Sequence, residues 1–232
     1  MSERAGEGPA PFFASGLPHA HQADEPAWPP AKEPLQFYFD FISPFGYFAS
    51  LGIDDLARKY GRETEWTSML LGVSVLKVMG LPPVVATPLK GAYVINDAKR
   101  YARRHRVPFN RPIELATSRP VEAGRVFAWA KEVSPQAAKR VAGRIFHSYF
   151  VGCRDIAQDS VLRGCVDESG LCWEGFEQAR AQGRAADLLR RNVDASIRRG
   201  VFGSPFFIVD NEPFFGVEKL PVVEDWLATG GW

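Results

Sequence analysis

Ser43 is the residue with the clearest chemical potential in this chain of 232 residues. It follows the apolar run 35–42 and precedes Pro44, so we expect a buried strand to end here and a helix to begin. A serine hydroxyl beside the backbone N–H groups of a helix N-terminus can donate hydrogen bonds to an anion such as a thiolate. The alternative is that Ser43 only caps the helix, because serine is a preferred N-cap residue.

The elements that must position Ser43 read as a β–α–β unit. A helix is predicted at 44–60, and Gly61 is expected to close it as a C-cap. The alternating pattern at 63–71 predicts a second strand, parallel to the first through a right-handed crossover. Ser43 would then lie at the carboxyl end of the first strand.

The middle of the chain, 72–200, reads mostly as helix, and strand signals return only after Gly200. The apolar run 206–209 and the resumed strand at 213–216 predict a hairpin, and 218–228 predicts a last helix. Helices are expected in the middle at 94–106, 155–168, 173–182 and 184–199. Two more are expected to begin at Ser118, as an N-cap, and at Ser134-Pro135. Residues 1–33 show no periodicity and are expected to form a flexible tail.

Composition narrows the class of protein. The chain is 46% hydrophobic and 24% charged with a net charge of +1, which suits a globular protein and gives no sign of a nucleic-acid or membrane partner. The first residues lack the layout of a signal peptide, and no apolar run approaches the length of a membrane span. Three cysteines and four dispersed histidines show no ligand spacing, so we expect free thiols, no metal site and a cytoplasmic location.

Four segments, taken in order, resemble the family of 2-hydroxychromene-2-carboxylate isomerases and their kappa-class glutathione transferase relatives. They are Phe-Tyr-Phe-Asp-Phe-Ile-Ser-Pro-Phe at 37–45, Pro-Leu-Lys-Gly-Ala-Tyr at 88–93, Gly-Val-Phe-Gly-Ser-Pro at 200–205 and Phe-Phe-Gly-Val-Glu-Lys-Leu at 214–220. The resemblance implies an α/β, DsbA-type thioredoxin-like fold, βαβ followed by ββα, with a large all-helical insertion. Its domains would be 34–71 with 200–232, the insertion 72–199 and the tail 1–33.

In thioredoxin-like oxidoreductases the strand-to-helix junction carries a Cys-x-x-Cys pair. Here the two cysteine positions are Ser43 and Gly46. A serine cannot cycle through a disulfide, so the redox chemistry is removed while the site's position is kept. The resemblance therefore implies that the protein holds the thiolate of another molecule, glutathione, with Ser43 as the catalytic residue.

The resemblance also assigns residues to glutathione. Ser204-Pro205 matches the loop that ends in the fold's cis-proline, and its alternative is an ordinary trans Ser-Pro turn. Glu218 would pair with the γ-glutamyl ammonium or serve only as a helix-capping acid, and Lys90 would bind the glycyl carboxylate or the substrate's carboxylate. The full set of expected glutathione contacts is Ser43, Phe45, Lys90, Gly203, Ser204, Pro205, Phe215, Gly216, Val217 and Glu218.

Four residues are candidates for contact with the substrate: Lys77, Leu81, Tyr93 and His105. Lys77 and His105 have plain alternatives as solvated surface residues, and for His105 we favour the surface over a role as proton shuttle. Isomerases of this family tend to carry Asn after the glycine that matches Gly80, whereas this chain has Leu81. An apolar wall replaces that polar contact, and 81–85 could equally be a hydrophobic lid or a dimer contact.

The function implied by the resemblance is a glutathione-dependent isomerase. A glutathione thiolate stabilised by Ser43 would add reversibly to an unsaturated aromatic ketoacid. One alternative is a kappa-like glutathione transferase or peroxidase that consumes glutathione, and another is a non-catalytic thioredoxin-like module that binds peptides. The expected partners are a small aromatic or unsaturated carboxylate and a possible homodimer, with no nucleic acid and no membrane.

Overall fold

The computed structural model describes residues 33–113 and 118–232. Apart from Glu33, the predicted tail lies outside the described residues. The elements in chain order are β1 (Leu35–Phe39), α1 (Pro44–Ser50), α2 (Ile53–Lys59), β2 (Thr64–Ser68), the π-helix η1 (Gly72–Val78), the 3-10 helix η2 (Val84–Ala86), α3 (Lys90–His105), α4 (Val121–Val133), α5 (Pro135–Phe146), the π-helix η3 (His147–Val151), α6 (Asp159–Asp167), α7 (Trp173–Ala181), α8 (Arg184–Arg198), β3 (Phe206–Val209), β4 (Glu212–Phe215), the 3-10 helix η4 (Val217–Lys219) and α9 (Leu220–Thr229).

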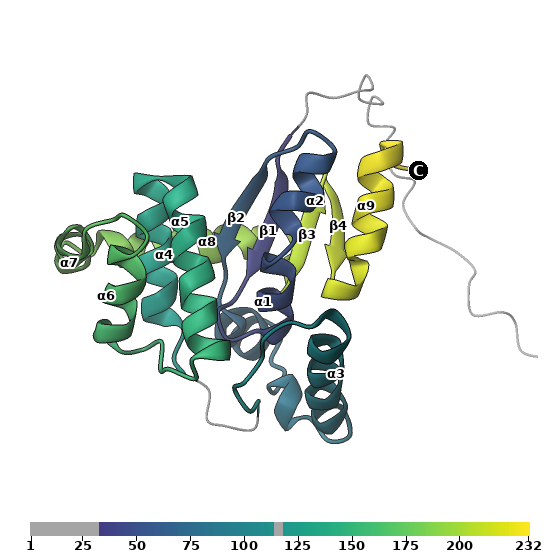
Figure 1. Cartoon of the computed structure of the whole chain (residues 1–232), viewed down its shortest axis with the longest axis horizontal. Coiled ribbons are helices and arrows are strands. Elements are labelled where there is room, and N and C mark those ends of the chain that lie inside the picture. The colour runs from purple at the N-terminus through teal and green to yellow at the C-terminus, as the bar shows by residue number, and fades with distance from the viewer. Residues whose placement is uncertain (1–32, 114–117) are drawn as a thin grey trace, which may run out of the picture. The chain divides into compact units, whose positions relative to one another are not determined.

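The strands form one mixed sheet in the order β2-β1-β3-β4 (Figure 1). β1 runs parallel to β2, with Phe37 opposite Trp66, and antiparallel to β3, with Phe37 opposite Phe207. β3 and β4 form the predicted hairpin. The expected thioredoxin-like fold, with a long helical segment between β2 and β3, is confirmed.

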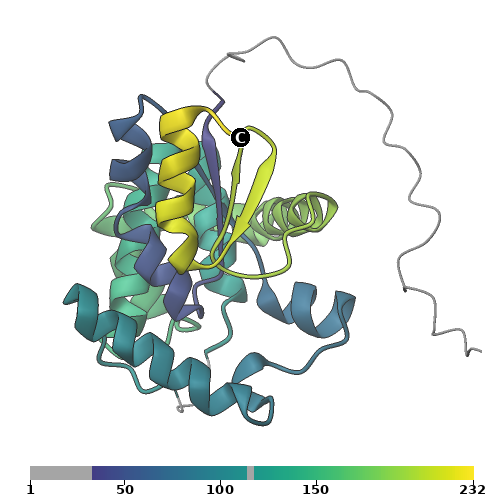
Figure 2. The same cartoon turned by 90° about the vertical axis from the view of Figure 1, so that its right-hand side faces the viewer.

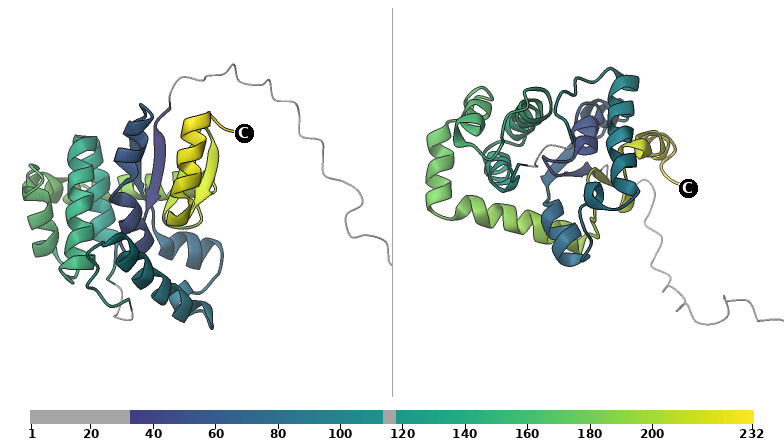
Figure 3. Two further views of the ribbon diagram at one scale, coloured as in Figure 1. Left: turned by 45° about the vertical axis from the view of Figure 1, so that its right-hand side comes forward. Right: turned by 90° about the horizontal axis from the view of Figure 1, so that it is seen from below.

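Helices cover both faces of the sheet. Figure 2 shows α2 and α9 on one side of the strands and α8 on the other. In β1 every residue except Gln36 is buried, as expected for a central strand packed on both faces. The helices α4–α7 are grouped beside the sheet, next to β2 (Figure 3), and α8 packs against α4 and α7 of this group and against β2.

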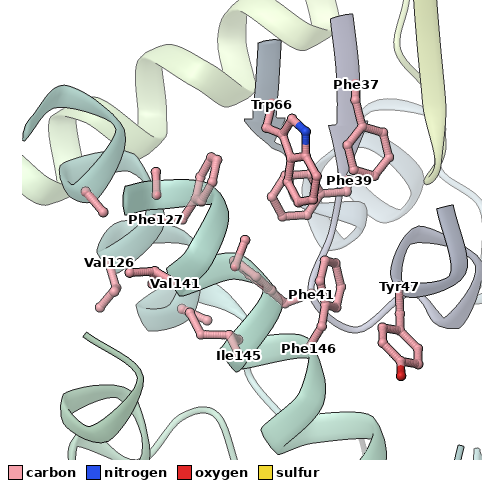
Figure 4. Packing of buried hydrophobic residues seen from close by; sticks show 14 of the residues in the cluster. Phe37, Phe39, Phe41, Tyr47, Trp66, Val126, Phe127, Val141, Ile145 and Phe146 are labelled. Atoms are coloured by element: carbon pink, nitrogen blue, oxygen red, sulfur yellow. The ribbon is translucent and has the colours of Figure 1, made fainter. Parts of the chain in front are cut away.

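An aromatic core joins the sheet to these helices (Figure 4). Phe39 is 0% exposed, and its ring centroid lies 5.6 Å from that of Trp66, 5.1 Å from that of Phe127 and 5.4 Å from that of Phe146. Such pairs add specific geometry to the hydrophobic free energy of burial. The strand that ends at the candidate site is therefore anchored by rings from β2, α4 and α5. The predicted boundary of a separate insertion domain at 72–199 stays a prediction.

The helix predicted at 44–60 is two helices. α1 ends at Ser50, and Gly52 occupies the N-cap position of α2. The predicted stop at Gly61 is confirmed: φ is +65°, its N–H bonds the carbonyl of Arg58, and the next N–H bonds that of Ala57, which is the Schellman arrangement. Glycine suits this position because it adopts positive φ without steric cost.

The predicted N-cap at Ser118 is wrong, whereas the predicted cap at Ser134 is confirmed. α4 begins only at Val121 and has no side-chain cap. The Ser118 hydroxyl instead donates to Asp155 Oδ1 at 2.6 Å, an acceptor that is distant in sequence. Ser134 Oγ accepts the backbone N–H of Ala137 at 3.2 Å and begins α5 as expected.

Candidate active site

Four chain segments meet at one end of the sheet. The carboxyl ends of the parallel strands β1 and β2 lie side by side there. β3 is antiparallel to β1 and therefore begins at the same end, and β4 ends beside it. The segments are the β1–α1 junction with Ser43, the residues after β2, the loop before β3 with Ser204 and the residues after β4 with Gly216. η1 and α3 lie beyond this end (Figures 1 and 2).

Ser43 is the N-cap of α1 and is only 5% exposed. Its Oγ accepts the backbone N–H of Gly46 at 3.1 Å and donates to the backbone oxygen of Ser204 at 2.9 Å. The capping role is therefore real, and it fixes the hydroxyl at the junction with the loop before β3. A serine hydroxyl has one proton, so the sulfur of a ligand would have to replace Ser204 O as its acceptor.

The loop before β3 has the predicted conformation. The Ser204–Pro205 peptide bond is cis, which excludes the trans turn. Pro205 O accepts the backbone N–H of Gly216 at 3.1 Å, so the loop is joined to the end of β4. A Cβ on Gly203 would overlap the ring of Phe215. Only glycine lets that ring lie directly over this backbone.

Gly46, at the second position of the lost cysteine pair, packs closely against Ser204. A Cβ on Gly46 would lie 2.7 Å from Ser204 Oγ, shorter than an ordinary contact. The Ser204 hydroxyl is held in place by the backbone N–H of Asp40, which donates to Ser204 Oγ at 3.0 Å. The space that a second cysteine would need is therefore already filled by a fixed side chain.

Asp40 is a buried acid that the sequence reasoning did not assign to the site. It is 1% exposed, and its carboxylate accepts the backbone N–H of Leu71 at 2.7 Å and that of Ile42 at 3.2 Å. Burial raises the pKa of Asp40 to about 6, although the two N–H donors act in the opposite direction. The available signal was a single acid inside the apolar run 35–42.

Two candidate charges for glutathione are exposed. Glu218 follows β4, and its carboxylate lies over Gly216, where a Cβ would overlap it. Lys90 begins α3 directly after Leu89, whose φ of 66° and ψ of −51° form a γ-turn closed by the Lys90 N–H to Pro88 O bond of 2.8 Å. Within 33–113 and 118–232, neither charge has an ion pair or a side-chain hydrogen bond. The side chain of Val217 is buried in the core, so only its backbone is available to a ligand.

The substrate candidates fall into two places. Lys77 and Leu81 lie in the exposed stretch between β2 and α3, here called the apolar segment (residues 71–89). Tyr93, one turn into α3, is 62% exposed, with the Arg100 guanidinium 5.7 Å from its ring centroid. His105 ends the 16-residue α3, about 22 Å from Lys90 along the helix axis. One small substrate therefore cannot contact both Lys90 and His105.

His105 has a structural partner of its own. Its ring stacks on Tyr101 at 4.1 Å between centroids, and Tyr101 stacks on Phe48 of α1 at 4.8 Å. The imidazole is otherwise exposed. This geometry favours the surface interpretation of His105 and fixes α3 against α1. Phe45, the remaining candidate from α1, is half-buried and meets Phe48 edge-on at 6.0 Å.

In the described part of the chain, no group of three or more His, Cys, Asp or Glu side chains could hold a metal ion. Cys153, Cys165 and Cys172 are free thiols. No helix within 33–113 and 118–232 has the length and apolar character required to cross a bilayer.

Comparison with known proteins agrees with this geometry. The family model for the DSBA-like thioredoxin domain matches residues 34–228. A 2-hydroxychromene-2-carboxylate isomerase of Sphingobium xenophagum is 28% identical over 197 residues, covering 83% of this chain and 97% of the relative. A glutathione S-transferase kappa 2 of Caenorhabditis elegans is 24% identical, covering 86% and 93%. The solved structure of a 2-hydroxychromene-2-carboxylate isomerase superposes with a TM-score of 0.70 at 22% identity, covering 84% of this chain and 94% of that one. The resemblance drawn from the four sequence segments is confirmed.

Proposed function

The chain belongs to the DSBA-like thioredoxin domain family, and from this premise we propose that it is a glutathione-dependent isomerase of the 2-hydroxychromene-2-carboxylate type. One observation carries the proposal. The position of the redox cysteine pair is kept at the β1–α1 junction, but Ser43 and Gly46 stand in it. Such a site can bind a thiolate and cannot exchange a disulfide. The similarity to isomerases and kappa-class transferases supports a glutathione-linked reaction.

The polar groups at this end of the sheet suit glutathione. Among the residues that the structure describes, Lys90 and Glu218 are charges of opposite sign without a partner, and glutathione carries carboxylates and an ammonium group at its ends. Ser43 and the cis-proline loop lie between β1 and β4 and would receive the central cysteine. When bound, glutathione supplies a thiolate that adds reversibly to an unsaturated carbonyl compound, permits rotation about the former double bond and then leaves.

Ser43 would stabilise the thiolate through local hydrogen bonds. Its hydroxyl turns from Ser204 O to the sulfur, which gives up one neutral hydrogen bond worth about 1 kcal/mol and gains a stronger, charge-assisted one. Pro44 has no N–H and the Gly46 N–H is bonded to Ser43 Oγ, so in the first turn the Phe45 N–H is the donor that would add to this effect. Because α1 has only seven residues, we ascribe the stabilisation to these nearby donors rather than to a long helix dipole.

The apolar segment would provide the substrate wall. Leu81 is 52% exposed, the cation Lys77 lies within the segment, and the cation Lys90 directly follows its last residue. Apolar side chains with a cation beside them suit an aromatic carboxylate. This is the chemistry of an unsaturated aromatic ketoacid, whose ring would lie on the wall while its carboxylate meets a lysine.

A kappa-like transferase is the second candidate function. It would use the same thiolate site but consume glutathione in forming a conjugate. Leu81, in the place of a polar residue typical of the isomerases, favours it because the polar substrate contact is missing. The two candidates differ in the fate of glutathione, which makes them separable in one assay.

The assay incubates the full chain with 2-hydroxychromene-2-carboxylate and glutathione, and follows both the substrate isomer and total free glutathione. An isomerase converts the substrate only when glutathione is present and leaves the amount of glutathione unchanged. Ser43→Ala should lower the rate by about 10²-fold, the size of loss typical of removing one donor to a developing anion. Loss of free glutathione with an electrophile would favour the transferase. Turnover of neither kind would contradict both and leave the peptide-binding module.

A further inference from the structure

Asp40 joins all the segments that meet at the candidate site except the end of β4. Its backbone N–H donates to Ser204 Oγ at 3.0 Å, and its backbone oxygen accepts the N–H of Ser43 at 3.0 Å. Its carboxylate accepts the N–H of Ile42 at 3.2 Å and that of Leu71 at 2.7 Å. One residue therefore contacts the loop before β3, the β1–α1 junction and the first residue of the apolar segment.

The carboxylate contact is more than local packing. Leu71 lies 31 residues from Asp40 in sequence, and within the described residues its N–H makes the one hydrogen bond that joins this carboxylate to the apolar segment. Both carboxylate oxygens are engaged by backbone donors, and within the described residues no cation pairs with the group. A buried charge held only by N–H groups depends on their geometry, and they in turn are fixed by it.

We propose that Asp40 is a positioning residue: its carboxylate holds the apolar segment at a fixed spacing from the loop that carries Ser43. The candidate substrate wall begins at one end of this link, and the candidate thiolate site is formed at the other. As a statement about catalysis, the proposal rests on the proposed function. As a statement about which segments Asp40 holds together, it stands alone.

Two variants break the link from its two ends. Asp40→Asn keeps the shape but replaces one acceptor oxygen with an N–H donor, so one of the two backbone donors loses its partner. Leu71→Pro removes the donor instead and leaves the charge of Asp40 in place. The φ of Leu71 is −56°, which proline adopts without strain. If Asp40→Asn does not fold, Leu71→Pro carries the test.

Asp54→Asn is the matched control. Asp54 is also an acid whose carboxylate accepts hydrogen bonds next to β2, from Trp66 Nε1 at 2.8 Å and from Lys139 Nζ at 3.2 Å. It contacts none of the segments around Ser43. Its replacement should lower stability without loosening the site.

The first readout is amide hydrogen exchange of the full chain without ligand. We expect both link variants to exchange at least about tenfold faster than wild type at 41–47 and 72–79, while α5 stays protected. Asp54→Asn should leave 41–47 and 72–79 unchanged. Equal acceleration in α5, or none in the two segments, would overturn the proposal. This readout needs no glutathione, so it decides the positioning role even if wild type binds none and the proposed function fails.

The second readout is the pH midpoint at which bound glutathione acquires thiolate absorbance. Positioning predicts that both link variants raise this midpoint by about one unit, a tenfold loss of thiolate stabilisation, because Ser43 is less well fixed. A nearby charge acting alone predicts the opposite for Asp40→Asn, since removing a negative charge lowers the midpoint, and no change for Leu71→Pro. That second pattern would exclude Asp40 as a positioning residue for the thiolate site.

Discussion

The floor of the candidate site, formed by Asp40, Ser43 and Ser204, and the apolar segment are built in opposite ways. Asp40, Ser43 and Ser204 are 1%, 5% and 9% exposed, and hydrogen bonds between them tie their segments together. The apolar segment has only one buried residue, Ser74, and exposes most of its large apolar side chains, although Leu71 and Val73 near its start pack against buried clusters. Those at least 39% exposed are Leu76, Val78, Met79, Leu81, Val84, Val85 and Leu89.

The contrast indicates which part of the site would stabilise the thiolate and which part would bind the substrate. A thiolate site needs donors held at fixed positions, because preorganised donors are what stabilise developing charge. A wall for an aromatic substrate needs apolar area, and it can adapt without losing its effect. We therefore expect substitutions in the floor to change stability and thiol chemistry together, and substitutions in the apolar segment to change mainly substrate preference.

The largest expected effect is on the free energy of unfolding, and it differs between Phe39, a ring beneath the floor, and Leu81, a side chain of the apolar segment. Phe39→Ala should lower the free energy of unfolding by about 4 kcal/mol, since it removes a fully buried ring that packs against rings of β2, α4 and α5. Leu81→Ala, at a half-exposed position, should change it by less than about 0.5 kcal/mol. Urea unfolding measures both. Equal losses of unfolding free energy in the two variants would contradict the contrast between the floor and the apolar segment.

The next largest effect is a pH dependence of stability that arises from Asp40 in the floor. The pKa of Asp40 is raised from 3.8 to about 6 by burial, so the folded state binds this proton more tightly than the unfolded state. Its stabilising contribution is therefore complete below about pH 4 and is lost as pH rises through 6, a fall of about 3 kcal/mol. Subtracting the unfolding free energy of Asp40→Asn from that of wild type at each pH isolates this contribution. A flat difference between pH 4 and 7 would show that Asp40 titrates normally.

A smaller effect tests the close packing of Gly46 against Ser204. Gly46→Ala places a Cβ 2.7 Å from Ser204 Oγ and should destabilise by about 1 to 2 kcal/mol. The matched control is Gly143→Ala in α5, where a Cβ meets no atom within 4 Å. There the gain in helix propensity should stabilise by about 0.5 to 1 kcal/mol. Thermal unfolding of the pair should therefore give shifts of opposite sign, and a rise in Tm for both variants would mean that Ser204 moves aside freely.

Much of the fold could be predicted from the sequence because its signals are local. The strand at the start of the βαβ unit and the hairpin near the C-terminus follow from short apolar runs with turn residues beside them. The stop at Gly61 follows from glycine's tolerance of positive φ. The break between α1 and α2 was missed because the helical pattern continues through Gly52, and glycine inside a helix is only modestly unfavourable.

The part of the site that was missed depends on distant partners. Asp40 bonds Leu71 and Ser204, 31 and 164 residues away in sequence. No local pattern announces such contacts, although an acid within a buried strand is itself a signal of a specific partner. Ser118 failed as a cap for the same reason, because Asp155 accepts its hydrogen bond. Similarity to relatives made Lys90 and His105 candidate ligand contacts, whereas the length of α3 keeps one small substrate from contacting both.

The central claim is that Ser43 stabilises a bound thiolate, and one titration tests it most directly. Glutathione is titrated by calorimetry into wild type, Ser43→Ala and Ser134→Ala, and thiolate absorbance is recorded in the same samples. Ser134 caps α5 by the same kind of bond, so its variant controls for loss of a cap. We predict saturable binding with a thiolate signal in wild type and Ser134→Ala, and a clear fall of that signal in Ser43→Ala. No binding at millimolar glutathione, or an undiminished thiolate signal in Ser43→Ala, would contradict the claim.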